Sequence, residues 1–413
     1  EMRLDELLQQ HDLADELVPA CRVITALRTC QRIRKVLLAL VSDSNSQQRR
    51  LGVVLALRYE PWIFRRDQGD LLGSVHVDLL RWKCSTEIRF RRGKHMQTVL
   101  KAIQAAALSQ PSWVGPSILR LDGCFIGAAG AGQLASHGVA HLRHLHELHL
   151  KGNDICDEGM RAIAEAFLAH HSLSLQLRTL NLSSNNIRKK GSVCLGRLLG
   201  MHEMTNLVNL DLSNNTLDLS CSELAHGLKN ATNLHTLDLS SISLNGKFHG
   251  AAVLARMPHL RHLNLSYNNI RNPGAALLAA SLSSLSSLHS LHLNANSFKD
   301  GKGAVSLFQA LEGMTLHTLS MNRMELDQKH IQNLLLSLSM ITSLRSLSLA
   351  YISKLVINCG YEACAKQHKN EGWRNLATLA SSCAHLRNLD LQGNFLGESG
   401  IVAVAGVLQQ RRR

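Results

Sequence analysis

Leucines recur along most of the chain in one short pattern, followed each time by a stretch with helical spacing. Leucines occupy positions 1, 4 and 6 of the pattern, asparagine occupies position 9 and an apolar residue position 11, as in Leu145 to Ile155. Further copies begin at Leu177, Leu207, Leu234, Leu260, Leu288, Leu316, Leu344 and Leu386, and a weaker copy contains Leu119, Leu121 and Ile126. Most starts are separated by roughly 26 to 32 residues, so the sequence predicts about ten tandem repeats.

The alternation within each copy predicts a short strand. Positions 4 and 6 face one side, whereas position 5 between them faces solvent. The stretches that follow, such as Asp157 to Phe167 and Gly274 to Leu282, carry small and apolar residues at helical spacing. One unit cannot seal its own core, so successive units must stack. We therefore expect an α/β solenoid, a horseshoe with a parallel inner sheet and outer helices.

The pattern and its long period resemble the leucine-rich repeats of the ribonuclease-inhibitor-like subclass, in which a full helix follows each strand. The resemblance covers about residues 116 to 410. It implies a binding role, because proteins of this class serve as inhibitors, innate sensors, axoneme components and subunits of large assemblies.

The asparagines at position 9 are expected to be structural, because their amides can bond backbone groups that the inward turn leaves unpaired. They are Asn153, Asn185, Asn215, Asn268, Asn296 and Asn394. Four copies carry Cys124, Ile242, Met324 or Ile352 instead. There we expect a looser turn, or backbone groups satisfied by another route.

The two ends of the repeat array differ from the pattern. Residues 1–110 predict helices and are interpreted as a helical N-terminal cap or docking region, with a degenerate first repeat near Glu87 to Phe90. An independent small domain is the alternative. Residues 111–413 form the predicted solenoid, with an insertion near residues 353–373. Cys359, Cys364 and His368 in the insertion suggest zinc, but their spacing lacks the usual CxxC pair, so we predict no metal.

Position 2 carries a column of basic and titratable residues that is predicted to line the inner face. Its members are His146, Arg178, His235, Arg261, His289, His317, Arg345 and Arg387, interrupted by Val208. Tyr267 and Tyr351 are the clearest aromatic residues on the same face. Such a column attracts acidic partners, and the alternative is a solvated face with no partner. Position 5, from His149 to Asp390, is polar and mixed in sign.

The balance of charge favours an anionic partner. The chain has 45 Lys and Arg against 31 Asp and Glu, a formal net charge of +14. A second candidate contact for such a partner lies in the N-terminal region, at Arg65, Arg66, Arg89, Arg91, Arg92 and Lys94. Aromatic residues are sparse, which disfavours binding to single-stranded RNA.

No sequence motif indicates catalysis. We find no phosphate-binding glycine loop, metalloprotease helix, nucleophile elbow or kinase signature, so we expect no enzyme and no cofactor. The glycines between Gly127 and Gly132 fall where a strand leads into its helix, where small residues permit close packing. Ten thinly spread cysteines predict reduced thiols in an intracellular compartment, and no apolar run approaches the roughly 20 residues of a membrane span.

The sequence therefore predicts a non-catalytic protein-binding scaffold or structural subunit of a larger assembly, which binds through the concave face, the basic N-terminal region or both. An RNA-contacting subunit of a ribonucleoprotein is the first alternative. A GTPase-activator-like module or the recognition half of an innate sensor is the other. The Ran GTPase activators share the repeat class, but this chain ends in arginines rather than in their acidic tail.

Overall fold

The computed structural model describes residues 87–89, 100, 103–104, 107–108, 117–142, 145–169, 177–244, 250–298, 302–326, 328–352, 371–394, 402 and 405. The chain divides into two compact units, Glu1–Trp82 and Lys83–Arg413, and every described residue belongs to the second.

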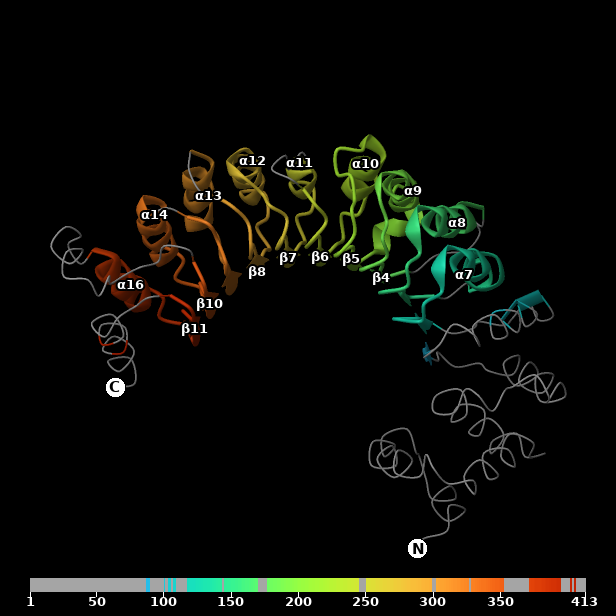
Figure 1. Cartoon of the computed structure of the whole chain (residues 1–413), viewed down its shortest axis with the longest axis horizontal. Helices are drawn as coiled ribbons and strands as arrows, with labels where there is room; N and C mark the ends of the chain where they lie inside the picture. The colour runs from blue at the N-terminus through green and yellow to red at the C-terminus, as the bar shows by residue number, and fades with distance from the viewer. Residues whose placement is uncertain are drawn as a thin grey trace, which may run out of the picture. The chain divides into compact units, whose positions relative to one another are not determined.

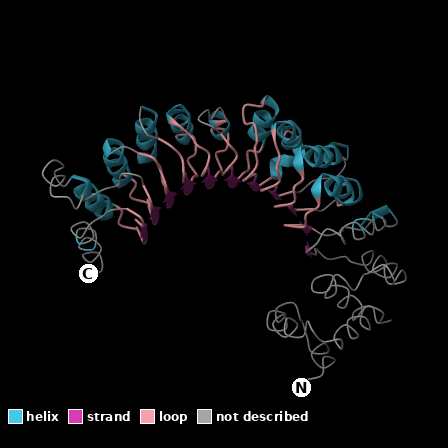
Figure 2. Cartoon of the chain, viewed as in Figure 1, coloured by secondary structure: helices cyan, strands magenta, loops and turns pink. Residues whose placement is uncertain are grey.

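In the described part of the second unit, short parallel strands form one 11-stranded sheet whose spatial order is the order of the sequence. The strands are β1 (Glu87–Arg89), β2 (Ile118–Arg120), β3 (Glu147–His149), β4 (Thr179–Asn181), β5 (Asn209–Asp211), β6 (Thr236–Asp238), β7 (His262–Asn264), β8 (Ser290–His292), β9 (Thr318–Ser320), β10 (Ser346–Ser348) and β11 (Asn388–Asp390). Figures 1 and 2 show the strands along the inner edge of a curved array, with the helices outside. The predicted α/β solenoid is therefore confirmed.

The helices follow their strands one by one and form the outer layer. They are α7 (Gly127–Gln133), α8 (Cys156–Ala169), α9 (Lys189–Leu199), α10 (Ser222–Asn230), α11 (Ala251–Leu254), α12 (Asn272–Leu282), α13 (Lys302–Glu312), α14 (Gln328–Ser339) and α16 (Glu371–Ser382). A π-helix η3 (Leu134–Gly138) and 3-10 helices η4 (Val139–His141) and η5 (His202–Asn206) complete two of the connections. The glycines from Gly127 to Gly132 lie within α7, and a Cβ on Gly127 or Gly132 would meet nothing within 4 Å, so close packing does not require glycine at those two positions.

The sheet begins before residue 111. β1 pairs in parallel with β2 and lies where the degenerate first repeat was expected, near Glu87 to Phe90. Residues 353–370 of the expected insertion lie outside the described part of the chain, as do the helices expected before residue 83. The last residues of the expected insertion, 371–373, are the first turn of α16.

Every strand pairs with the next in a register that places equal pattern positions opposite each other. Leu148 lies opposite Leu180, and Leu180 lies opposite Leu210. These leucines are 0–1% exposed, because they fill the layer between sheet and helices. A slip of one residue would turn every one of them to solvent, so the burial of the leucines holds the register.

Glycines allow the outer helices to approach closely. A Cβ atom on Gly303 of α13 would lie 1.9 Å from the backbone oxygen of Asn272, and one on Gly196 of α9 would lie 2.3 Å from the backbone carbon of Glu223. Any side chain at these two positions would push neighbouring repeats apart.

The asparagines at position 9 join neighbouring repeats through buried hydrogen bonds. The Asn185 side-chain amide donates to the C=O of Leu150 in the preceding repeat at 2.7 Å and to that of Leu182 in its own repeat at 3.0 Å. Its Oδ1 accepts the N–H of Asn153 at 3.0 Å. Asn185 is fully buried. One side chain thus satisfies backbone groups of two turns that water cannot reach.

Apolar residues at position 9 are accommodated by the asparagine of the following repeat. The N–H of Cys124 donates to Asn153 Oδ1 at 2.8 Å, and the N–H of Ile242 donates to Asn268 Oδ1 at 2.9 Å. The N–H of Ile352 donates to Asn394 in the same way, at 3.0 Å. The N–H of Asn153 donates to Asn185 Oδ1 in the same way, so this bond does not depend on the residue type at position 9.

Removing one member of this asparagine ladder should destabilise the solenoid. Asn185→Ala leaves buried groups of two repeats without their partners, so we expect the free energy of unfolding to fall by about 3 kcal/mol. Urea denaturation followed by circular dichroism measures the change. Asn206→Ala, on the exposed end of η5, is the control and should stay within about 0.5 kcal/mol of wild type. Equal effects of the two substitutions would contradict a structural role for Asn185.

Candidate protein-binding face

The residues at position 2 lie directly before their strands and form a continuous line across the sheet. The backbone N–H of each donates to the C=O of its counterpart in the preceding repeat, from Arg178 to Arg387, at 2.7–2.9 Å. The arginines of the column, Arg178, Arg261, Arg345 and Arg387, are exposed, whereas His146, His235, His289 and His317 are half-buried. The strand pairing thus places residues about 30 positions apart in sequence about 5 Å apart in space.

Position 3 contributes a second column that was not predicted from the sequence; most of its members are half-buried, His262 and Asn388 are exposed, and Ser290 is buried. It contains Glu147, Thr179, Asn209, Thr236, His262, Ser290, Thr318, Ser346 and Asn388. The signal was present, since the alternation that exposes position 5 on one side of the buried leucine exposes position 3 on the other. This column adds His262 to the predicted histidines and supplies small hydroxyl side chains over β8 to β10.

The beginning of the described sheet carries charges that neutralise one another. Glu147 on β3 accepts hydrogen bonds from Arg120 on β2 at 3.2 Å and from His149 at 3.1 Å. These side chains are only partly exposed, and each basic group already has a carboxylate within reach. The inner surface near β2 and β3 is therefore less attractive to an acidic partner than the residues at position 2 alone would suggest.

The middle of the face has two acidic residues whose oxygens are already occupied. Asp211 accepts from Ser213 at 2.7 Å and from Asn181 at 3.0 Å. Asp238 accepts in the same way from Ser240 at 2.6 Å and from Asn264 at 2.9 Å. The Asp211 carboxylate thus links β5 to β4, and the Asp238 carboxylate links β6 to β7. These hydrogen bonds are internal to the face.

The repeats of β7 to β10 carry no carboxylate at positions 2, 3, 5, 7 and 8, and we name this surface the β7–β10 face. Its basic groups are Arg261, Arg323 and Arg345, and its imidazoles belong to His262, His289, His292 and His317. The rings of His289 and His317 meet edge to face, with centroids 4.7 Å apart. The face is therefore positive or neutral throughout.

Desolvation lowers the pKa of three of these imidazoles. Desolvation lowers the pKa of His317, and the neighbouring Arg345 and His289 lower it further. Desolvation also lowers the pKa of His262, assisted by His289, Arg261 and His235. The pKa of His292 is lowered by desolvation as well, although the charge of Asp238 opposes the change. Protonating one member of the cluster thus disfavours protonating the next.

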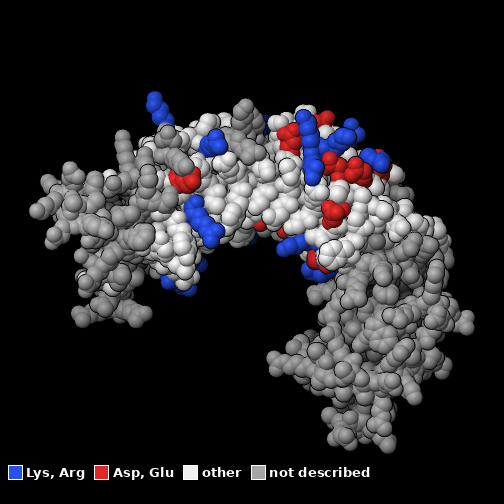
Figure 3. All heavy atoms as spheres, in the orientation of Figure 1, with Lys and Arg blue, Asp and Glu red and all other residues white. Residues whose placement is uncertain are grey.

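The outer side of the sheet differs in its charge pattern. Figure 3 shows acidic and basic side chains intermingled over α8 to α10. Arg161 and Glu165 form an ion pair there at 2.8 Å, and Lys189 and Asp218 approach to 3.6 Å. Mixed charges of this kind create no field of one sign, unlike the β7–β10 face.

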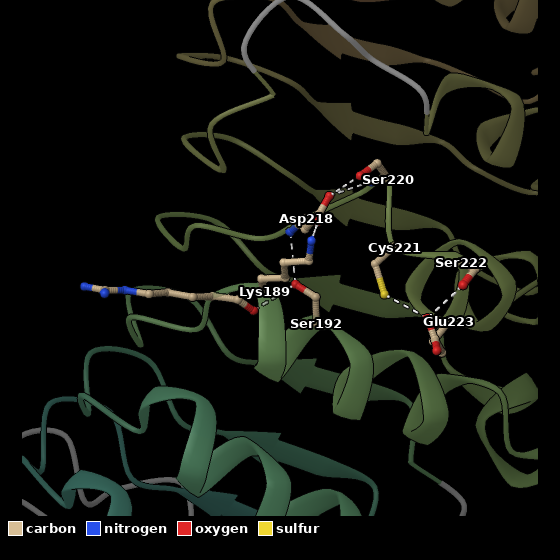
Figure 4. Close-up of polar contacts among 8 residues, drawn as sticks. Lys189, Ser192, Asp218, Ser220, Cys221, Ser222 and Glu223 are labelled. Atoms are coloured by element: carbon tan, nitrogen blue, oxygen red, sulfur yellow. Dashed lines mark hydrogen bonds and ion pairs between the residues drawn. The ribbon is translucent and has the colours of Figure 1, made fainter.

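The turn before α10 gathers a thiol, hydroxyls and carboxylates, but their contacts are those of a helix start (Figure 4). Asp218 accepts from the hydroxyl and N–H of Ser220, which lowers its pKa. Glu223 accepts from the Cys221 thiol at 3.2 Å and from Ser222 at 2.8 Å. Burial raises the pKa of Cys221, so the sulfur remains a thiol rather than a nucleophilic thiolate.

The remaining sequence-predicted site residues are not brought together by the described structure. Arg89 lies in β1, while Arg65, Arg66, Arg91, Arg92 and Lys94 lie outside the described residues, as do Cys359, Cys364 and His368. The buried Cys383 thiol contacts the carbonyls of Leu338 and Ile341. Within the described residues no group of His, Cys, Asp and Glu could hold a metal, and no described helix is long and apolar enough to cross a membrane.

Comparison with known proteins agrees with this geometry. The leucine-rich-repeat family model matches residues 141–164, 176–196, 256–279 and 382–405. Ribonuclease inhibitor of Sus scrofa is 29% identical over 71% of this chain and 61% of its own length. Tonsoku-like protein of Bos taurus is 32% identical over 50% of this chain and 16% of its own. NACHT, LRR and PYD domains-containing protein 14 of Homo sapiens is 28% identical over 70% of this chain and 24% of its own length.

The chain therefore spans less than two thirds of the length of each of these relatives. The repeated pattern, the in-register sheet and the matches together define a leucine-rich-repeat protein. Within that class the chain is of the ribonuclease-inhibitor-like type, in which a helix follows each strand.

The histidine cluster should make stability depend on pH. The folded chain binds protons less readily than the unfolded chain at His262, His292 and His317, whose ordinary pKa is near 6.5. Stability from this source is present above about pH 6.5 and is lost as the pH falls below it. We expect a lower urea midpoint at pH 5.5 than at pH 7.5, and a smaller difference in His292→Gln. His202→Gln, at an exposed position in η5, should keep the wild-type difference between the two urea midpoints. If it reduces that difference as much as His292→Gln does, the histidine cluster is not its source.

Proposed function

We propose that the chain is a non-catalytic protein-binding scaffold, or a structural subunit of a larger assembly, that holds an acidic protein partner on its concave face inside the cell. Residues 1–110 act as the cap of the array and offer a second, basic contact. The observation that carries the proposal is the β7–β10 face, where basic, imidazole and hydroxyl groups lie together without a carboxylate.

Electrostatic complementarity supports an acidic partner for this face. Arg261 and Arg345 are exposed, and neither has a carboxylate partner among the described residues. An incoming carboxylate would therefore find free guanidinium donors that form bidentate hydrogen bonds. The hydroxyls of Thr318 and Ser346 beside them can donate or accept in the same interface.

The comparisons support a protein rather than a small molecule as the partner. Ribonuclease inhibitor is, by its name, an inhibitor of a ribonuclease, which is itself a protein. A solenoid presents an extended concave surface of the kind that suits a macromolecular ligand. The same positive charge would also favour binding to RNA within a ribonucleoprotein. That is the alternative outcome of the tests below.

Capture of the tagged full chain from its own cells, with and without nuclease, separates these partners. We expect protein partners that stay bound after nuclease. Their retention should fall with salt because the proposed contacts are ionic, but less steeply than the retention of a phosphate-bound partner. Partners that leave with the RNA, and an affinity that falls steeply with salt, would overturn the proposal in favour of a ribonucleoprotein subunit.

Charge reversal on the concave face tests where the partner binds. The combined variant Arg261→Glu, His289→Glu, His317→Glu and Arg345→Glu should weaken binding of the captured partner by about 100-fold or more, because acidic groups would then face each other. Isothermal titration calorimetry measures the affinity, and circular dichroism checks that the variant is folded.

A control with the same change in net charge uses residues outside the concave face, Lys190→Glu, Arg256→Glu and Arg271→Glu. We expect it to bind within about threefold of wild type, since long-range steering affects mainly association rates. If both variants bind like wild type, the concave face is not the contact, and the interface lies in residues 1–110 or 353–370.

A further inference from the structure

Position 8 of the repeat, in the turn after each strand, has a left-handed backbone wherever the structure describes it. The φ angles at this position lie between 53° and 69°. The cause is the stacking itself, because the N–H here donates to the C=O at position 7 of the next repeat. For Tyr267 that bond reaches Asn294 at 2.7 Å, and for Tyr351 it reaches Gln392 at 2.8 Å.

The residues at position 8 divide into two groups. Outside the β7–β10 face they are glycine, serine or asparagine, namely Gly123, Gly152, Ser184, Asn214, Ser241 and Gly393. These residues suit a left-handed turn, because glycine lacks a Cβ and short polar side chains bond locally. Within the face they are Tyr267, Ala295, Arg323 and Tyr351. The turn requires none of the large side chains.

Large residues in this conformation are strained, since the Cβ approaches the following carbonyl at a cost of roughly 1–2 kcal/mol per residue. Such outliers persist where they serve a function. Here Tyr267 is 54% exposed and Tyr351 is 46% exposed, so burial in the core does not explain them. Arg323 is exposed as well.

Arg323 and Tyr351 are already arranged for binding. The Arg323 guanidinium carbon lies 5.8 Å from the centroid of the Tyr351 ring, within the range of a cation–π contact. The other neighbour of the ring is Gly393, where a Cβ would come within 2.3 Å of it. Glycine in the last described repeat therefore makes room for the ring. No carboxylate pairs with Arg323 among the described residues.

We propose that Tyr267, Arg323 and Tyr351 form a ledge along the edge of the β7–β10 face that docks an extended acidic peptide segment of the protein partner. The inference rests on the proposed function and specifies its contact. The ledge crosses the repeats of β7 to β10, about 14 Å at the usual strand spacing. That length matches about four residues of extended chain. A central carboxylate pairs with Arg323, and flanking apolar groups lie on the two tyrosines.

A peptide fits the ledge better than a nucleic acid does. Single-strand binders stack successive bases on free aromatic faces. Tyr351 has Arg323 over its ring and Gly393 against it, and Tyr267 is separated from it by two repeats. Tyrosine and arginine are, in addition, the residue types that most often dominate the affinity of protein–protein contacts.

Substitution by asparagine tests the ledge while sparing the fold. Tyr267→Asn in the full chain should bind the captured partner roughly 30-fold more weakly, as for an interface hot spot. The same substitution should keep Tm or raise it by about 1–2 °C, because asparagine relieves the left-handed strain. Ser241→Asn, at the same position in the repeat of β6, is the matched control and should bind like wild type. Loss of stability in Tyr267→Asn, or wild-type binding, would overturn the proposal.

The chemistry of the ligand is tested with defined probes. Fluorescence polarisation compares a labelled ten-residue glutamate-rich peptide, its glutamine counterpart and a single-stranded oligouridylate. We expect the wild-type chain to prefer the glutamate peptide and Arg323→Gln to lose that preference. Equal binding of the oligouridylate, equally reduced by Arg323→Gln, would overturn the peptide assignment.

The two proposals fail in distinguishable ways. If charge reversal at position 2 abolishes capture while Tyr267→Asn and Arg323→Gln bind like wild type, the ledge is refuted and the concave scaffold stands. If neither set of substitutions changes binding, both are refuted.

Discussion

In-register stacking of identical strand positions is the constraint on which the rest of the structure depends. A three-residue strand with its helix cannot bury its leucines or satisfy the backbone groups of its turns alone. Once Leu148, Leu180 and Leu210 lie opposite one another, every other pattern position is also aligned. The same register builds the asparagine ladder inside and the surface columns outside, so the core and the proposed binding face have one physical origin.

The charge of the inner surface is set repeat by repeat. Each repeat contributes one residue to each column, so charge accumulates only where neighbouring repeats carry residues of the same sign. Glu147 neutralises Arg120 at one end, and the carboxylates of Asp211 and Asp238 are occupied in the middle. The β7–β10 face carries no carboxylate of its own, and it is also where large side chains occupy the left-handed position 8 of the repeat.

The sequence predicted the core better than the face, for physical reasons. Leucine spacing reports burial directly, so the strands and the roles of the asparagines followed from the pattern alone. β1 was predicted only as a degenerate repeat near Glu87 to Phe90, because Glu87–Arg89 lacks the leucines that mark the other strands. The position 3 column was missed although alternation implies it. The backbone strain at Tyr267 and Tyr351 could not be predicted from the sequence, because the residue type does not determine the φ angle. Ion pairing at Glu147 likewise depends on contacts between repeats.

Hydroxyl-radical footprinting of the full chain with and without its captured partner tests the central claim most directly, because it reports the solvent exposure of individual tyrosine and histidine side chains. The account predicts that partner binding protects Tyr267, Tyr351 and His317 on the concave face, while Met340, 65% exposed just after α14, reacts as before. Protection of Met340 with unchanged reactivity of the two tyrosines and His317 would place the partner on the outer helices and contradict it.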